Sequence, residues 1–197
     1  MGNVWWYLTR ITGVLAWVFA SASVILGLTL STRVAAHRGR ARRALELHRT
    51  ASALTLVYLA LHLAALVGDG YADFGWIDLV VPFASDWRPA PVAAGVVAAW
   101  LLLAVQVTSW ARARLPRGWW RRVHYASFGV YLLATWHALT AGSDARTSLF
   151  VLAVDASVLT VTVLTLWRIG RAWADAEPRS VLPGSGGSRR VRAAGVR

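Results

Sequence analysis

The stretch Leu47–Val67, LHRTASALTLVYLALHLAALV, decides the fold class. It is mostly apolar, and a helix needs about 20 such residues to cross the hydrocarbon core of a membrane. His48, near its start, and His62, near its end, interrupt the apolar pattern. Ionisable side chains inside a membrane span are costly, rare and usually functional. The stretch therefore predicts both a spanning helix and a site.

Further apolar segments of similar length lie on both sides of this stretch: Ile11–Ser31, Val92–Trp110, Val123–Ala141 and Leu149–Trp167. The chain of 197 residues is 57% hydrophobic and 15% charged, whereas soluble domains average about 45–50% apolar and about 25% charged residues. We therefore predict an all-α integral membrane bundle with about five transmembrane helices. The absence of cysteine excludes disulfides, thiolate metal sites and iron–sulfur clusters.

The net charge of +12 comes from arginine without any lysine. Most arginines follow the first, third and fifth apolar segments, whereas the other connections hold few. Because cytoplasmic loops of membrane proteins are enriched in basic residues, we expect the amino terminus outside and the carboxyl terminus in the cytoplasm. Because most arginines lie in the connections between apolar segments or after the last one, membrane topology explains the positive charge, and we expect no nucleic-acid partner. Membrane lipid is the expected surrounding, and the plasma (inner) membrane is the expected location.

We predict two regions in the chain. Residues 1–174 form the transmembrane domain, and residues 175–197 form a disordered basic tail on the cytoplasmic side. The tail contains Pro178, Pro183 and the run Gly184-Ser185-Gly186-Gly187-Ser188, a composition typical of disordered chain. It is too short for a folded nucleotide- or flavin-binding domain.

The segment Val123–Ala141 also carries two histidines, His124 and His137. At about 1.5 Å rise per residue, His48 and His62 are about 21 Å apart along a helix, and His124 and His137 about 19.5 Å. The two segments lie two crossings apart, so both run from inside to outside. We therefore expect His48 level with His124 near the inner face, and His62 level with His137 nearer the outer face.

Two imidazoles at each level predict haem as the cofactor. Two ligands do not complete a tetrahedral zinc or copper site. Haem supplies four nitrogens itself and needs only two axial ligands. We expect two haem b groups, an inner one at His48/His124 and an outer one at His62/His137, and no catalytic residue at the iron. The alternative of histidines that hydrogen-bond inside the bundle remains open.

Glycine and arginine residues accompany the histidines. Gly13 and Gly27 are separated by the same interval as His48 and His62, and a glycine lets a macrocycle approach a helix closely. Ordinary small-residue helix packing is the alternative. Haem propionates favour arginine partners, and the candidates are Arg33, Arg49, Arg121 and Arg122 at the inner haem and Arg10 or Arg88 at the outer one.

Two other features have two interpretations each. Asp155, inside the last apolar segment, either relays a proton or pairs within the bundle. The connection Gly68–Pro91, which is rich in aromatic residues, either caps the outer haem and meets an acceptor or forms an interfacial amphipathic segment.

The chain resembles the ferric reductase-like transmembrane domain family. That family includes the membrane domains of ferric reductases and NADPH oxidases and the haem subunit of a bacterial periplasmic methionine sulfoxide reductase system. Trp120-Arg121-Arg122-Val123-His124-Tyr125 is similar to its Trp–basic–His segment, and Asp78-Leu79-Val80-Val81-Pro82-Phe83 to its outer loop. The resemblance extends from about Trp6 to Trp167. It implies axial haem ligation by the four histidines and outward electron flow, although this chain has no attached FAD/NADPH domain and fewer spans than several relatives.

These observations predict a transmembrane dihaem b-type cytochrome, the electron-transfer subunit of a ferric reductase-like oxidoreductase. Its donor would be a cytoplasmic flavoprotein reductase or a quinol, with FMN, FAD or quinone supplied through that partner. Its acceptor would be an extracytoplasmic molecule or partner reductase. The alternatives are a quinol-coupled cytochrome b anchor of a peripheral dehydrogenase and a haem-free transporter or assembly factor.

Overall fold

The computed structural model describes residues 2–32, 38–68 and 74–176, and within them the chain is helical without strands. Five helices are long: α1 (Gly2–Ser31), α2 (Arg38–Gly68), α4 (Pro89–Trp110), α5 (Arg117–Ala141) and α6 (Ser148–Ala176). Two are short: α3 (Trp76–Val80) and the 3₁₀ helix η1 (Ser143–Arg146). This arrangement confirms the prediction of an all-α bundle of about five long helices.

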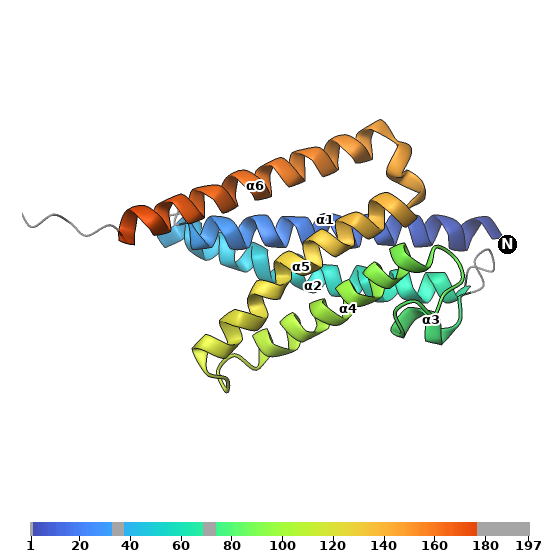
Figure 1. Ribbon diagram of the computed structural model, residues 1–197, viewed down its shortest axis with the longest axis horizontal. Coiled ribbons are helices and arrows are strands. Elements are labelled where there is room, and N and C mark those ends of the chain that lie inside the picture. Colours follow the sequence, from blue (N-terminus) through green and yellow to red (C-terminus); the bar gives the residue numbers. More distant parts are fainter. Residues whose placement is uncertain (1, 33–37, 69–73, 177–197) are drawn as a thin grey trace, which may run out of the picture.

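Four of these helices, α1, α2, α4 and α6, are long and apolar enough to cross a membrane. Helix α5 is less apolar because it begins with several arginines and carries two histidines. The chain nevertheless returns through α5, since α4 ends at one end of the bundle and α6 begins at the other (Figure 1). The protein is therefore a multi-pass membrane protein.

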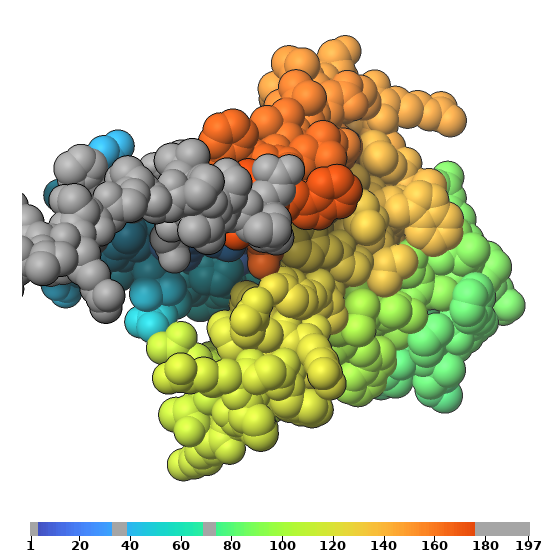
Figure 2. Space-filling view, turned by 60° about the vertical axis from the view of Figure 1, so that its left-hand side comes forward, coloured from blue at the N-terminus to red at the C-terminus, as the bar shows by residue number. Residues whose placement is uncertain are grey.

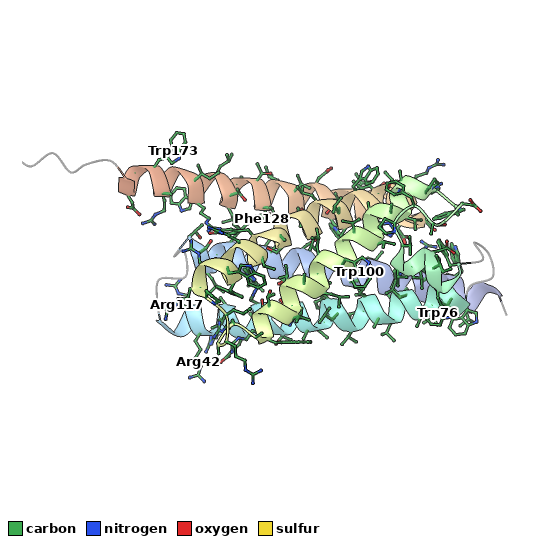
Figure 3. All side chains as sticks on the ribbon, turned by 60° about the horizontal axis from the view of Figure 1, so that its bottom comes forward. Arg42, Trp76, Trp100, Arg117, Phe128 and Trp173 are labelled. Atoms are coloured by element: carbon green, nitrogen blue, oxygen red, sulfur yellow. The ribbon has the colours of Figure 1, made fainter. Side chains whose placement is uncertain are left out.

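The helices form two antiparallel hairpins, α1–α2 and α4–α5, while α6 packs along α1 (Figure 1). Helices α2 and α5 run in the same direction, as the sequence predicts for segments two crossings apart. Arg42 and Arg117 lie at one end of the molecule and Trp76 at the other (Figure 3). We call these the basic end and the loop end.

Several helices are longer than their apolar segments. Helix α2 starts at Arg38 and α5 at Arg117, so both include arginines expected in connections. Backbone hydrogen bonding continues past the hydrocarbon, where arginine side chains reach water while the helix persists. Helix α6 extends to Ala176, just inside the predicted tail. The remaining residues of that tail, 177–197, lie outside the described part of the chain, as does the candidate Arg33.

The interior is made of small clusters rather than one core. Trp17 packs with Phe150 and Val154, and Leu28 packs with Tyr131 and Val161. The Trp17 indole also donates to the Thr135 hydroxyl at 3.0 Å. The remaining space between the two hairpins is not filled by side chains. One cavity lies at the loop end and another at the basic end.

Candidate functional site

His62 and His137, the loop-end pair, line the cavity at the loop end. The Nδ1 atom of His62 lies 2.9 Å from the carbonyl oxygen of Thr9 on α1, and that of His137 lies 2.8 Å from the carbonyl oxygen of Pro91 on α4. A carbonyl oxygen only accepts hydrogen bonds, so each Nδ1 carries the hydrogen. The lone pair of each neutral imidazole is then on Nε2, the atom that ligates a metal.

Each histidine of the loop-end pair lies against a glycine of the neighbouring helix. A Cβ atom on Gly13 would lie 3.0 Å from Nδ1 of His62, and one on Gly95 would lie 2.8 Å from Nδ1 of His137. Each glycine follows its accepting carbonyl by one helical turn. The missing side chain therefore leaves room for the ring to reach that carbonyl, an arrangement we call a glycine–carbonyl seat.

His48 and His124, the basic-end pair, line the cavity at the basic end. Their ring centroids are 6.2 Å apart, with planes inclined by 69°. A metal–imidazole bond of about 2 Å and about 1 Å from nitrogen to ring centre give about 6 Å between two imidazoles on opposite sides of one metal. The separation of this pair matches that requirement.

The basic-end pair has one glycine–carbonyl seat instead of two. His48 Nδ1 donates to the carbonyl oxygen of Ser23 at 2.8 Å, and a Cβ on Gly27 would lie 3.5 Å from the ring. His124 instead lies near Ser109, whose hydroxyl is 3.4 Å from Nδ1. The His124 ring stacks on Trp120, with centroids 5.0 Å apart.

The sequence missed Gly95 and Ser109. Gly13 and Gly27 on α1 have the same separation as Gly95 and Ser109 on α4. This repeated interval of 14 residues could have revealed both positions. It is hard to recognise because position 109 is a serine, whereas positions 13, 27 and 95 are glycines. The glycines contact the imidazole rings themselves and also line the cavities.

The two cavities differ in size but adjoin. The basic-end cavity has a volume of about 1110 Å³ and the loop-end cavity about 250 Å³. Typical small-molecule sites measure about 300–1,000 Å³, so a macrocycle fits the basic end by size and the loop end only if the hairpins separate further. Both cavities are lined by the same residues at mid-depth, Ala20, Thr55, Leu102 and Val130.

Arginine side chains surround the basic-end cavity: Arg49, Arg112, Arg121 and Arg168. No aspartate or glutamate of the described residues lines it. Arg121 and Arg168 both donate to the hydroxyl of Tyr125, at 3.2 and 2.9 Å. Arg49 and Arg121 were expected at this level. Arg112 and Arg168 were not, because their contribution depends on how the ends of α4 and α6 face the cavity.

The positive charge of Arg10 at the loop-end cavity is balanced by a carboxylate. Arg10 makes an ion pair with Asp144 of η1, with 3.0 Å between Arg10 Nε and Asp144 Oδ2. Arg88, the other arginine expected there, donates to the carbonyl of Thr140 and does not line this cavity. Asp155 is exposed on α6 rather than turned into the bundle.

The connection between α2 and α4 also lines the loop-end cavity, through Phe74, Asp78, Leu79 and Trp87. Within the described ranges, no group of three or more His, Asp or Glu side chains is arranged to hold a bare metal ion. Each level offers two imidazoles, a donor set that suits a planar macrocycle with two free axial positions.

Fold and site thus define a multi-pass helical membrane protein with two imidazole pairs along its interior. The family model described as "Ferric reductase like transmembrane component" matches residues 9–135, which is more than half of the chain. The chain belongs to this family. The match includes three of the four histidines and ends just before His137.

The family is one of transmembrane electron-transfer modules, and haem is its typical cofactor. No curated protein and no solved structure matches the chain.

Proposed function

We propose that this protein is a dihaem b-type cytochrome of the plasma membrane that carries electrons between the two membrane faces as a redox subunit. The observation that carries the proposal is the paired imidazoles, three of which have Nδ1 hydrogen-bonded to a backbone carbonyl. This bond orients the ring and raises its basicity as a ligand. Two such imidazoles at one level are suited to the axial positions of haem.

In this proposal, the histidine pairs hold the haem groups and arginines bind the haem propionates. His48 and His124 hold the basic-end haem, and His62 and His137 hold the loop-end haem. Arg49 and Arg121 line the basic-end cavity, where they bind propionate carboxylates through charge-assisted hydrogen bonds. Haem bound there would supply one-electron transfer between its ferric and ferrous states.

We assign the basic end to the cytoplasm, because arginines concentrate there and cytoplasmic loops are enriched in basic residues. The donor, a cytoplasmic flavoprotein or a membrane quinol, then meets the basic end. The acceptor, a small molecule or a partner reductase, meets the loop end. Figure 2 turns the basic end toward the viewer, with the start of α5 and the end of α6 on this side. Arg121 of α5 and Arg168 of α6 both line the basic-end cavity.

The test is the reduced-minus-oxidised absorbance spectrum of the purified protein, with haem quantified as pyridine haemochrome. Two b-type haems per chain are expected. One haem per chain would contradict the dihaem form. A colourless protein that haem cannot reconstitute would overturn the cytochrome and favour a haem-free transporter or assembly factor.

The donor is tested separately. Rapid haem reduction by a reduced flavin or flavoprotein, with slow reduction by quinol, is the result expected for a reductase-like subunit. The reverse preference identifies a quinol-coupled anchor of a peripheral dehydrogenase.

A further inference from the structure

The segment Phe74–Ala84 leaves a strongly apolar surface uncovered. Trp76, Ile77 and Phe83 are 72%, 67% and 70% exposed, and Val80 and Val81 are about half exposed. The one charged side chain of this segment, Asp78, lies on the cavity side and accepts a hydrogen bond from the backbone N–H of Gly75 at 2.8 Å. The outward face of the segment is therefore without charge.

The depth of the segment follows from its contacts with α4. Phe74 and Leu79 are buried against Val92 and Val96, which lie about 4 to 11 Å from the start of α4 at about 1.5 Å per residue. Helix α4 has 22 residues, about 33 Å, which only just exceeds the hydrocarbon core of about 30 Å. The segment consequently lies below the level at which α4 enters the hydrocarbon.

Trp100 strengthens this placement. Its indole N–H donates to the carbonyl oxygen of Val80 at 2.9 Å, although Trp100 lies in the middle of α4 and half of its surface is exposed. In Figure 3, Trp76 lies near the end of the bundle and Trp100 farther along it. The last carbonyls of a helix lack intrahelical partners, and such groups must be satisfied where water is absent.

The outward surface of the segment continues a lipid-facing surface. Leu103 and Val107 are exposed on α4 beyond Trp100, as expected for a spanning helix. Phe83 also supports a lipid-facing surface. Its backbone φ of 67° lies in a region that residues other than glycine rarely adopt. A glycine would fit the turn with less strain, so we interpret the exposed phenylalanine ring as a lipid contact.

We infer that the segment Phe74–Ala84 is a re-entrant cap that lies within the hydrocarbon of one leaflet. Its inner face closes the loop-end cavity, and its outer face contacts lipid acyl chains. The loop-end pair is thus screened from the side by a lipid-held element, and water and polar molecules reach its cavity only from the membrane surface.

The test uses single-cysteine variants, since the chain has no native cysteine. Ile77→Cys and Phe83→Cys carry a nitroxide label in phosphatidylcholine vesicles, and collisions with oxygen, which enters lipid, are compared with those of a water-soluble nickel chelate. Leu103→Cys on α4 provides the lipid reference, and Asp86→Cys, exposed on the same connection, provides the water reference. We expect labels at 77 and 83 to behave like that at 103, with several-fold preference for oxygen.

Labels at 77 and 83 that behave like the label at 86 would overturn the inference, because the segment would then face water. Low collision with both reagents would overturn it too, because protein would then cover the face. Trp100→Phe is the second variant, and loss of the indole N–H is expected to increase the mobility of the label at 77. These readouts do not require haem, so their outcome is independent of the haem count.

Discussion

The loop-end and basic-end pairs each take one histidine from α2 and one from α5, but the surroundings of the two pairs differ. At the loop end, both imidazoles occupy glycine–carbonyl seats, the cavity is narrow, and the arginine is paired with Asp144. At the basic end, one imidazole has such a seat and the other lies near a serine hydroxyl. The basic-end cavity is wide and lined by arginines without a carboxylate.

Under the proposed function, this difference gives the two pairs different tasks. Close contacts and backbone hydrogen bonds restrict the loop-end rings to one position. The basic-end pair has a wider cavity, an adjustable hydroxyl contact and a positive surrounding. Such a site favours anionic groups and accommodates movement of its ligands. The comparison also shows that equal histidine spacing does not make two sites equal, because neighbouring helices supply the seats.

The largest expected effect comes from removing one histidine of each pair. His62→Ala and His48→Ala should each reduce the haem content from two to one per chain. Added imidazole should restore the second haem in His48→Ala, where the cavity is wide, and not in His62→Ala. Pyridine haemochrome measures the content, and unchanged circular dichroism serves as the control. Equal rescue at both ends would contradict the difference in space.

The second prediction compares two glycine substitutions. In Gly95→Ala the new Cβ would lie 2.8 Å from the His137 ring, whereas in Gly27→Ala it would lie 3.5 Å from the His48 ring. Overpacking costs about 1–3 kcal/mol, so Gly95→Ala should weaken loop-end haem affinity about 5- to 150-fold. Gly27→Ala should leave basic-end affinity close to that of the wild type.

Haem titration of the apoprotein measures both affinities. If the two alanine variants lose haem equally, the close approach at Gly95 does not hold the ring. Gly13→Ala, with a Cβ 3.0 Å from His62, should fall between them.

The third prediction concerns the ion pair at the loop end. Asp144→Asn leaves Arg10 without its carboxylate partner, so the loop-end cavity gains positive charge. Positive charge favours ferrous over ferric iron, and the loop-end midpoint potential should rise by tens of millivolts. A spectroscopic redox titration measures it. Asp144→Glu keeps the charge and is the control, and an equal rise in that variant would attribute the effect to packing.

The smallest expected effect comes from making the two pairs more alike. Ser109→Gly creates a fourth glycine–carbonyl seat, in which His124 can reach the carbonyl of Val105. A stronger acceptor at Nδ1 raises imidazole basicity and stabilises ferric iron. The basic-end potential should fall on the order of ten millivolts, while the loop-end potential stays unchanged. Ser109→Ala, which removes the hydroxyl and keeps a Cβ, is the matched control.

Much of the fold could be predicted from the sequence because membrane insertion depends on apolar length. The carboxyl-terminal boundaries of the first, third and fourth apolar segments coincide with the ends of α1, α4 and α5. The level of the histidines could also be predicted, because rise per residue converts sequence spacing into depth. The apolar segments predicted the spans and not the full helices, because arginine-rich turns extend α2 back to Arg38 and α5 back to Arg117.

The sequence by itself determined a helical membrane protein with two imidazoles at each of two depths. Only the tertiary structure decided that Gly95 receives His137, that Ser109 faces His124, and that Arg10 pairs with Asp144. Apolar length and rise per residue are properties of one helix. Seats, ion pairs and cavities instead depend on which faces of different helices meet, and an apolar sequence surrounded by lipid leaves those faces nearly equivalent.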